Sequence, residues 1–572
     1  MKKLCIRIVA LLMLATLMVG CFAGCTPEEE TEVKINLPEP GVPVTLDVMV
    51  YRHPEGQSDG EELWYFNYLE HWLAEEYDLD VSLNVVNSDA SQVSLQLSGN
   101  NLPDLVFGIG LAANDAVKFG SEEEMILDWT PYLNETYMPN LTAHLKADPG
   151  IKTASTLPDG KIYGLPYIKP RMAYSGIIGQ SERFFLRQSW LDEIGMKNPT
   201  TYDELLAVLR AMKAKHPDRY TVVTSEGFLE KYVWTCLGFY GTEPAKYGTK
   251  FMIDKDGKLV LPCYDPQYKE FIKFMNTLVS EGILAKDYAS AANAQAVAYS
   301  QNGGAGGYCW WTLDSMASEK DLGLDWVSVN PVPMGDVKSV DEIHVSALST
   351  YDVNKAWASA DTEYPALVAL IMDFMYSDEG AFLYRYGVPE GQDPLNMIDG
   401  YKYDAKGNIT TKLVENKTYN NMTNYGRDIL YPADNVGVRP AVVTTGSGKM
   451  KEYTDSVTGE KYTALDTMYL DPATNVGSYY LTVIEHWTKH MTTIRLPAVY
   501  MNGDDVFDNT QYSTAIADYV TAESMNFIKG TRPCTDAEFE KFFAELKQLG
   551  VEDYIALNQS ALEGWMNTTF GK

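Results

Sequence analysis

The sequence predicts an α/β protein with a parallel sheet and more than one lobe. Between residues 44 and 108, short strand-like stretches alternate with longer helix-like stretches, an order typical of parallel α/β sheets. The chain has 572 residues, which is too long for one hydrophobic core, so we expect at least two lobes.

Each expected element has a local signal. Val44–Val50 alternates apolar and polar residues as a strand does. Thr201 with Glu204 forms a capping box at a helix start, and Gly550 suits the position after a helix end. We expect strands at Val44–Val50, Val81–Val86 and Leu102–Gly108, and helices at Glu61–Tyr77, Ala90–Ser98, Tyr202–Lys215, Pro266–Glu281, Tyr364–Tyr376 and Asp536–Leu549.

Tight turns are expected at Leu157–Pro166 and Met252–Val260, because each places Asp-Gly-Lys between apolar residues. Asp404–Asn408 is expected to form another hairpin tip. Asp254-x-Asp256-Gly257 resembles the start of a calcium loop, but the bidentate Glu of an EF-hand is missing downstream, so the segment is interpreted as a turn and no metal site is predicted.

The first residues indicate export. Lys2, Lys3 and Arg7 precede the uncharged apolar run 8–20, which is too short to span a bilayer alone. Gly20-Cys21 then resembles the lipobox of bacterial lipoproteins, in which the cysteine is acylated and becomes the new N-terminus. Cys25 is the alternative acylated residue, and an ordinary cleaved signal peptide is the other interpretation.

Charge excludes two classes of partner. Removing residues 1–20 moves the net charge from −32 to −35. Nucleic-acid binding needs Lys and Arg to neutralise phosphates, so no nucleic-acid partner is predicted. An acidic body is also repelled by anionic lipid, so we expect membrane contact through the lipid anchor only.

The sequence contains no recognised catalytic or cofactor motif. It lacks G-x-S-x-G and the Walker and dinucleotide fingerprints, and the glycine-rich segment 303–307 is followed by Tyr308-Cys309-Trp310-Trp311 rather than by Lys-Ser/Thr. We therefore predict neither an enzyme nor a cofactor. Isolated buried thiols are favoured over a disulfide for Cys236, Cys263, Cys309 and Cys534. The 11 Trp and 38 Tyr suit cores and also a cleft that stacks rings on sugar faces.

Four segments carry a resemblance to a known family. Their order along the chain is that of the lipoprotein branch of the family 1 extracellular solute-binding proteins, which are substrate receptors of ABC importers. Ser189 stands where this family usually has Asp, and Pro389 is an extra residue. The segments are Phe185–Leu205, Ile162–Pro166, Met375–Gly391 and Phe527–Leu549.

The resemblance implies a two-lobed, periplasmic-binding-protein-like α/β fold with a ligand cleft between the lobes. The expected organisation is a signal peptide at 1–20, a flexible acidic tether at 21–43, the first part of lobe 1 at 44–168, the first part of lobe 2 at 169–335, crossing segments that return to lobe 1 and then lobe 2 at 336–400, and a part that completes the lobes at 401–572.

Ligand-binding residues are expected where strands end, because ligands of parallel α/β sheets bind beyond the carboxyl ends of the strands. Tyr51 and Arg52 follow the first strand, and Tyr167 directly follows Leu165-Pro166. Neighbouring residues of a strand point to opposite faces, so one ring of the Trp310-Trp311 pair should face the cleft. The full set of candidates is Tyr51, Arg52, Asp104, Tyr167, Trp234, Trp310 and Trp311.

The resemblance implies a lipid-anchored, extracytoplasmic receptor that captures a polar solute, with an oligosaccharide as the expected ligand, and passes it to ABC permease subunits. We expect it to act as a monomer. The alternatives are a surface glycan-active enzyme and a glycan-binding scaffold without a transporter.

We predict that the mature protein carries its lipid on Cys21, because Gly20-Cys21 ends the apolar run. Mass spectrometry of the native N-terminal peptide checks this. An acyl group on Cys25, or an unmodified N-terminus, would contradict the assignment.

Overall fold

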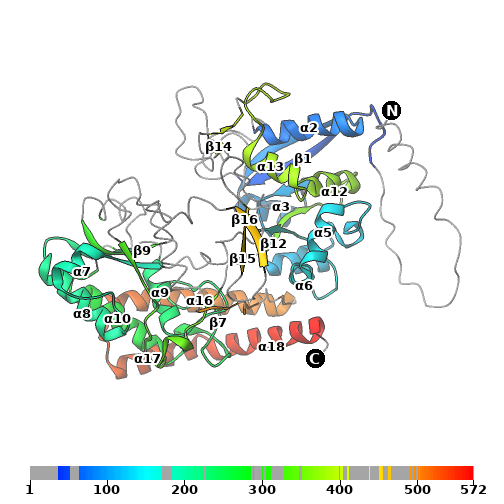
Figure 1. Cartoon of the computed structure of the whole chain (residues 1–572). Coiled ribbons are helices and arrows are strands. Elements are labelled where there is room, and N and C mark those ends of the chain that lie inside the picture. The colour runs from blue at the N-terminus through cyan, green and yellow to red at the C-terminus, as the bar shows by residue number, and fades with distance from the viewer. Residues whose placement is uncertain are drawn as a thin grey trace. The chain divides into compact units, whose positions relative to one another are not determined.

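The structure of the chain is a computed structural model (Figure 1). The residues that the structure describes are 37–51, 63–169, 183–224, 227–284, 288, 299, 304–310, 326–346, 351–398, 400–403, 409–410, 437, 450–454, 461–465, 490–492, 494–496, 500–501 and 503–570. Among them, no helix is long and apolar enough to cross a membrane.

The first lobe is built on a five-stranded sheet with the order β2-β1-β3-β12-β4. β1 pairs in parallel with both β2 and β3, whereas β12 runs antiparallel to its neighbours β3 and β4. The strands are β1 Val44–Tyr51, β2 Val81–Ser88, β3 Leu105–Phe107, β4 Leu165–Ile168 and β12 Tyr351–Ala358.

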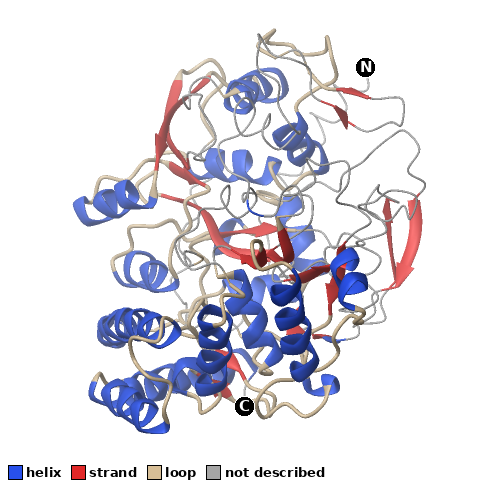
Figure 2. Cartoon of the chain, turned by 90° about the vertical axis from the view of Figure 1, so that its left-hand side faces the viewer, coloured by secondary structure: helices blue, strands red, loops and turns tan. Residues whose placement is uncertain are grey.

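Helices cover this sheet (Figures 1 and 2). Val106 and Trp357 are completely buried on neighbouring strands, and the Trp357 indole N–H donates to the Ile109 carbonyl over 2.9 Å. α13 joins α2 through an edge-on contact between Tyr384 and Tyr65. The helices are α2 Trp64–Tyr77, α3 Ala90–Gly99, α4 Ala113–Asp115, the π-helix η2 Ala116–Glu122, α5 Pro139–Ala147, α6 Pro149–Ser155, α12 Pro365–Phe374 and α13 Asp378–Tyr386.

The second lobe is built on a four-stranded sheet with the order β10-β5-β9-β6. β9 pairs in parallel with β6, and β5 runs antiparallel to β9 and β10. The strands are β5 Arg183–Arg187, β6 Tyr220–Thr224, β9 Ala305–Trp310 and β10 Trp326–Val329.

One large apolar core surrounds the second sheet and includes residues from the end of the chain. Ile516 and Val520 of α16 and Phe542 of α17 are buried in it with Phe184 of β5. Figure 1 shows α16 and α18 running alongside each other. The helices are α7 Gln188–Ile194, α8 Tyr202–Lys215, α9 Phe228–Cys236, α10 Tyr268–Ser280, α16 Gly503–Ile528, α17 Asp536–Gln548 and α18 Val551–Phe570.

The remaining strands form two-stranded pairs. All are antiparallel except β11 with β17, which is parallel. They are β7 Met252–Ile253 with β8 Leu259–Val260, β11 Val345–Ser346 with β17 Met491–Thr492, β13 Lys402–Tyr403 with β14 Ile409–Thr410, and β15 Met450–Thr454 with β16 Lys461–Leu465.

Local sequence signals predicted several elements correctly. α8 spans the expected residues, and its cap is formed as expected, with Thr201 Oγ1 accepting from the Glu204 backbone N–H over 3.3 Å. The hairpin β7–β8 is confirmed, because one Asp254 carboxylate oxygen accepts the backbone N–H groups of Asp256 and Lys258. The strand expected over Leu102–Gly108 is shorter, 105–107, and the long helices α16 and α18 were not predicted.

Several connections join the lobes. The first leaves the first sheet after β4, and the second re-enters it at β12. The third runs from β17, which pairs with β11, to Tyr500 in the first core. Helices α12 and α13 pack with the first lobe and lie within the expected crossing region 336–400. Helix α16 then carries the chain to the second core.

A charged residue is enclosed in the second lobe. Glu230, in the first turn of α9, is completely buried, and neither carboxylate oxygen has a hydrogen-bond partner among the described residues. Lys246 Nζ lies 3.7 Å from Glu230 Oε1. Burial raises the pKa of Glu230, and the Lys246 ammonium offsets only part of this effect.

The raised pKa predicts how Glu230→Gln changes stability with pH. Above the pKa of the unfolded state, about 4.3, the folded wild type binds more protons than the unfolded chain, so its free energy of unfolding falls as pH rises. Glu230→Gln has no group at this position that titrates, so its free energy of unfolding does not fall with pH for this reason. Its stability relative to wild type should therefore increase from pH 4 to pH 7 in urea unfolding.

Glu281→Gln is the matched control. The hydrogen bond from Arg210 lowers the pKa of Glu281, so that variant should lose stability relative to wild type over the same pH range. If the difference in the free energy of unfolding between Glu230→Gln and wild type stays constant with pH, the prediction is contradicted.

Candidate functional site

The carboxyl ends of four strands meet at one edge of the first sheet. β1 and β2 end side by side at Tyr51 and Ser88, and β3 ends next to them at Phe107. β4 has the same direction as β3 because both are antiparallel to β12, so it ends at this edge with Ile168. This is the edge at which α/β sheets bind ligands.

Charged and aromatic side chains come together at the β4 end of this edge. Lys169 follows β4, and its Nζ lies 2.7 Å from Asp352 Oδ2 on β12. The same ammonium lies 5.6 Å from the centre of the Tyr167 ring. About a quarter of the Lys169 side chain and a third of the Asp352 side chain are exposed, so both remain accessible to a polar ligand. Such groups make charge-assisted hydrogen bonds to hydroxyls.

The corresponding edge of the second sheet is formed by three strand ends. β6 and β9 run in parallel and end at Thr224 and Trp310, and β5 begins opposite Trp310 with Arg183. α9 follows β6, and the Leu229 backbone N–H donates to Thr224 Oγ1. The Trp310 backbone therefore lies at the predicted edge.

The other predicted residues at these two edges are placed as follows. Tyr51 is half-buried at the end of β1, and Tyr167 is 4% exposed within β4. Arg52 and Trp311 lie outside the described residues, as does the side chain of Trp310.

Asp104 and Trp234 lie elsewhere. Asp104 precedes β3, at the opposite edge of the first sheet, where its Oδ2 accepts the Asp47 backbone N–H over 2.9 Å. Trp234 is completely buried, its indole N–H donates to the Lys246 carbonyl, and its ring stacks on Phe271 at 4.2 Å. These contacts hold a strand and a core together, so we leave both residues out of the proposed binding surface.

Sequence reasoning missed Lys169 and Asp352. Each stands in an ordinary strand-like context, and no local pattern marks either as functional. Only the antiparallel pairing of β4 with β12, which sets Asp352 opposite Tyr167, brings them together.

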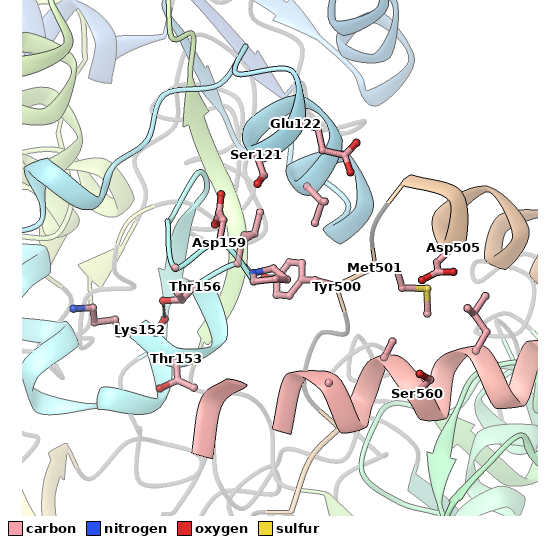
Figure 3. Close-up of a pocket in the computed structure, with 17 residues that line it drawn as sticks. Ser121, Glu122, Lys152, Thr153, Thr156, Asp159, Tyr500, Met501, Asp505 and Ser560 are labelled. Carbon is pink, nitrogen blue, oxygen red and sulfur yellow. Dashed lines mark hydrogen bonds between the residues drawn. The ribbon is translucent and has the colours of Figure 1, made fainter. Parts of the chain in front are cut away.

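A separate cavity of about 860 Å³ is lined by residues of the first lobe and of the C-terminal helices (Figure 3). Its walls come from η2, α6, the turn before β4, the start of α16 and the end of α18. This turn leads into the amino end of β4, so the cavity is distinct from the edge that holds Lys169. Figure 3 labels Ser121, Glu122, Lys152, Thr153, Thr156, Asp159, Tyr500, Met501, Asp505 and Ser560 among its lining.

Cysteine and metal chemistry find no support in the described part of the chain. The four body cysteines are free thiols there, as the sequence analysis favoured. Burial raises the pKa of Cys236 to about 12, which keeps that thiol protonated and unreactive. No group of three or more candidate metal ligands occurs among the described residues.

Comparisons with known proteins are consistent with this architecture. The fructooligosaccharide ABC transporter substrate-binding protein FusA of Streptococcus pneumoniae is 22% identical over 529 residues, which are 90% of this chain and 89% of FusA. The polygalacturonan/rhamnogalacturonan-binding protein YtcQ of Bacillus subtilis is 24% identical over 332 residues, which are 56% of this chain and 61% of YtcQ.

Solved structures show the same two-lobed fold. FusA in complex with kestose matches with a TM-score of 0.67 and 20% identity over 91% of this chain and 99% of that one. An HMO-binding, ABC-transporter-associated solute-binding protein from Bifidobacterium longum infantis matches with a TM-score of 0.68 and 19% identity over 92% of this chain and 99% of that one.

The family model of the bacterial extracellular solute-binding proteins matches residues 58–382, which is more than half of the chain. The resemblance seen in the four sequence motifs is thereby confirmed, and this chain belongs to the bacterial extracellular solute-binding protein family.

Proposed function

We propose that this protein is a lipid-anchored extracellular receptor that captures an oligosaccharide and delivers it to the permease subunits of an ABC importer. The observation that carries the proposal is its similarity to FusA over about nine-tenths of both chains. FusA and YtcQ are both named for carbohydrates that they bind, which favours a carbohydrate over a peptide.

The geometry supports capture of a polar, ring-shaped solute. Each lobe has a sheet edge at which strands end, and the first-lobe edge combines the half-buried Tyr51 with the partly exposed pair of Lys169 and Asp352, whereas the Tyr167 ring is buried behind this pair. Aromatic rings stack on the apolar faces of sugars, while charged groups bond their hydroxyls. We propose that Arg52, Trp310 and Trp311 complete this surface.

Closure of the two lobes around the solute would complete the site. Each edge alone is an open surface, and a solute held by both edges would be shielded from water, which strengthens its polar contacts. Domain closure about a few connecting residues is a common way to achieve this. The chain of this protein leaves the first sheet after β4 and re-enters it at β12, so the two lobes share connections about which such a motion can occur.

A surface glycan-active enzyme and a glycan-binding scaffold are the competing functions. An enzyme would convert its ligand, whereas a receptor releases it unchanged. A scaffold would bind polymers on an open surface without closing. Binding stoichiometry, product analysis and compactness on binding therefore separate the three.

We predict that short oligosaccharides raise the melting temperature without being cleaved. Kestose, nystose, maltotriose and a galacturonate trimer are suitable probes, with free fructose and glucose as monosaccharide controls. A ligand that binds only the native state stabilises it by about 2.7 kcal/mol at a hundredfold excess over Kd. Chromatography of each mixture after incubation checks for cleavage. Cleavage products would place the protein among enzymes, and a flat response to every sugar would contradict a carbohydrate ligand.

We further predict that the two tryptophans after the glycine-rich segment have different roles. If the extended backbone of β9 continues past Trp310, one ring faces the solute and the other the core. Alanine at the solute-facing position should weaken binding severalfold and leave the melting temperature of the free protein unchanged. Alanine at the core position should cost about 3–5 kcal/mol of stability. Normal binding of the identified sugar by both variants would show that the pair is structural.

A further inference from the structure

Two oppositely charged residues lie where the chain leaves the first lobe and where it returns to it. At the first connection, Lys169 is the last described residue before the chain leaves the first lobe, and its ammonium contacts Asp352 at 2.7 Å. At the second connection, Tyr351 and Asp352 are the first described residues of β12. One ion pair therefore joins the end of one connection to the end of another.

The position of Asp352 is fixed by the backbone around it. Asp352 pairs with Tyr167, and the register then shifts before Ala356 pairs with Leu165. Asn354 lies within this bulge with a φ of +57° and is 1% exposed. A bulge changes the direction in which a strand presents its side chains, so it sets where the Asp352 carboxylate lies.

The third connection approaches the same carboxylate. On the second-lobe side, the Leu496 backbone N–H donates to the Gly241 carbonyl over 2.8 Å. On the first-lobe side, the Tyr500 hydroxyl donates to the Ala154 carbonyl over 3.1 Å. Arg495, next to Leu496, interacts electrostatically with both Tyr351 and Asp352.

We propose that Asp352 is a positioning residue that links the ends of the first two connections and so sets the arrangement of the lobes before the solute arrives. Its carboxylate contacts the Lys169 ammonium of the first connection and interacts electrostatically with Arg495 of the third. Without it, Lys169 would lose its anionic partner, and charge attraction would no longer hold the ends of the first two connections together. This inference rests on the proposed capture of a solute between the lobes.

The test measures the distance between the lobes in the protein without solute. Dyes are placed at Leu95→Cys on α3, whose side chain is 73% exposed, and at Lys541→Cys on α17, in a Cys21→Ser, Cys25→Ser and Cys534→Ser background. Single-molecule energy transfer should show a shifted and broader distance distribution for Asp352→Asn than for wild type. Asp352→Glu, which restores the charge, should return the distribution toward wild type.

The salt dependence of the distance distribution provides a second measurement, and in the wild-type protein it needs no substitution at Asp352. At 1 M ionic strength the Debye length is about 3 Å, so the wild-type distribution should move toward that of Asp352→Asn. The distribution of Asp352→Asn itself should change less. This comparison keeps the inference testable even if that variant folds poorly.

Glu281→Gln is the matched control. It breaks the ion pair of Arg210 with Glu281, which is more exposed than the Lys169 pair and lies within the second lobe. It should leave the distance distribution unchanged. If Asp352→Asn lowers only the melting temperature, or leaves both the distribution and its salt dependence as in wild type, Asp352 has no positioning role.

Solute binding separates this inference from the proposed function. If both hold, Asp352→Asn should change the Kd of the identified oligosaccharide by roughly two- to fivefold, the range expected for an exposed ion pair. If no sugar binds but the distance distribution still shifts, the proposed function fails and the positioning role stands.

Discussion

The return of the chain into the first sheet as β12 is the constraint on which the candidate site depends. Asn354 adopts a left-handed conformation that few residues other than glycine adopt readily, and its carbonyl accepts the Leu111 backbone N–H over 3.0 Å. Gly164 and Gly110 lie so close to Asn354 that a Cβ at either position would come within 3 Å of it. These contacts leave little freedom in how β12 enters the sheet. They place β12 between β3 and β4, and so create the edge where Lys169 meets Asp352.

The sequence could predict what local interactions determine. The cap at Thr201, the turn at Asp254 and the parallel strands of the first lobe depend on residues a few positions apart. It could also identify the family, because four short motifs keep their order along the chain. It could not show that Trp234 is enclosed, because a buried helix and a ligand-facing helix have the same aromatic content. It could not find Lys169 and Asp352 either, because residues far apart in the sequence become neighbours only through the β4–β12 pairing.

Charges in the interior of this protein have a different role from those at the lobe junction. Asp373 is buried, and its carboxylate accepts the backbone N–H groups of Asn140 and Leu141 at the start of α5. Arg532 is bound by Glu523, Glu538 and Glu545 and so fixes the turn between α16 and α17. Each of these charged groups makes several hydrogen bonds at once, and hydrogen bonds to charged groups contribute about 1.5–3 kcal/mol each. These pairs therefore favour one rigid arrangement within each lobe.

The junction of the lobes has the opposite requirement. A receptor that closes on its solute needs two arrangements whose free energies differ by only a few kcal/mol, so that the differential affinity of the solute can shift the balance. Strong buried pairs at the connections would favour one arrangement too much. The pair of Lys169 with Asp352 is partly exposed, and such pairs contribute only about 0.2–1 kcal/mol. That magnitude is enough to orient the connections and small enough to be exceeded by the contacts of a bound solute. The exposure of these charges is therefore what makes them suitable for a hinge.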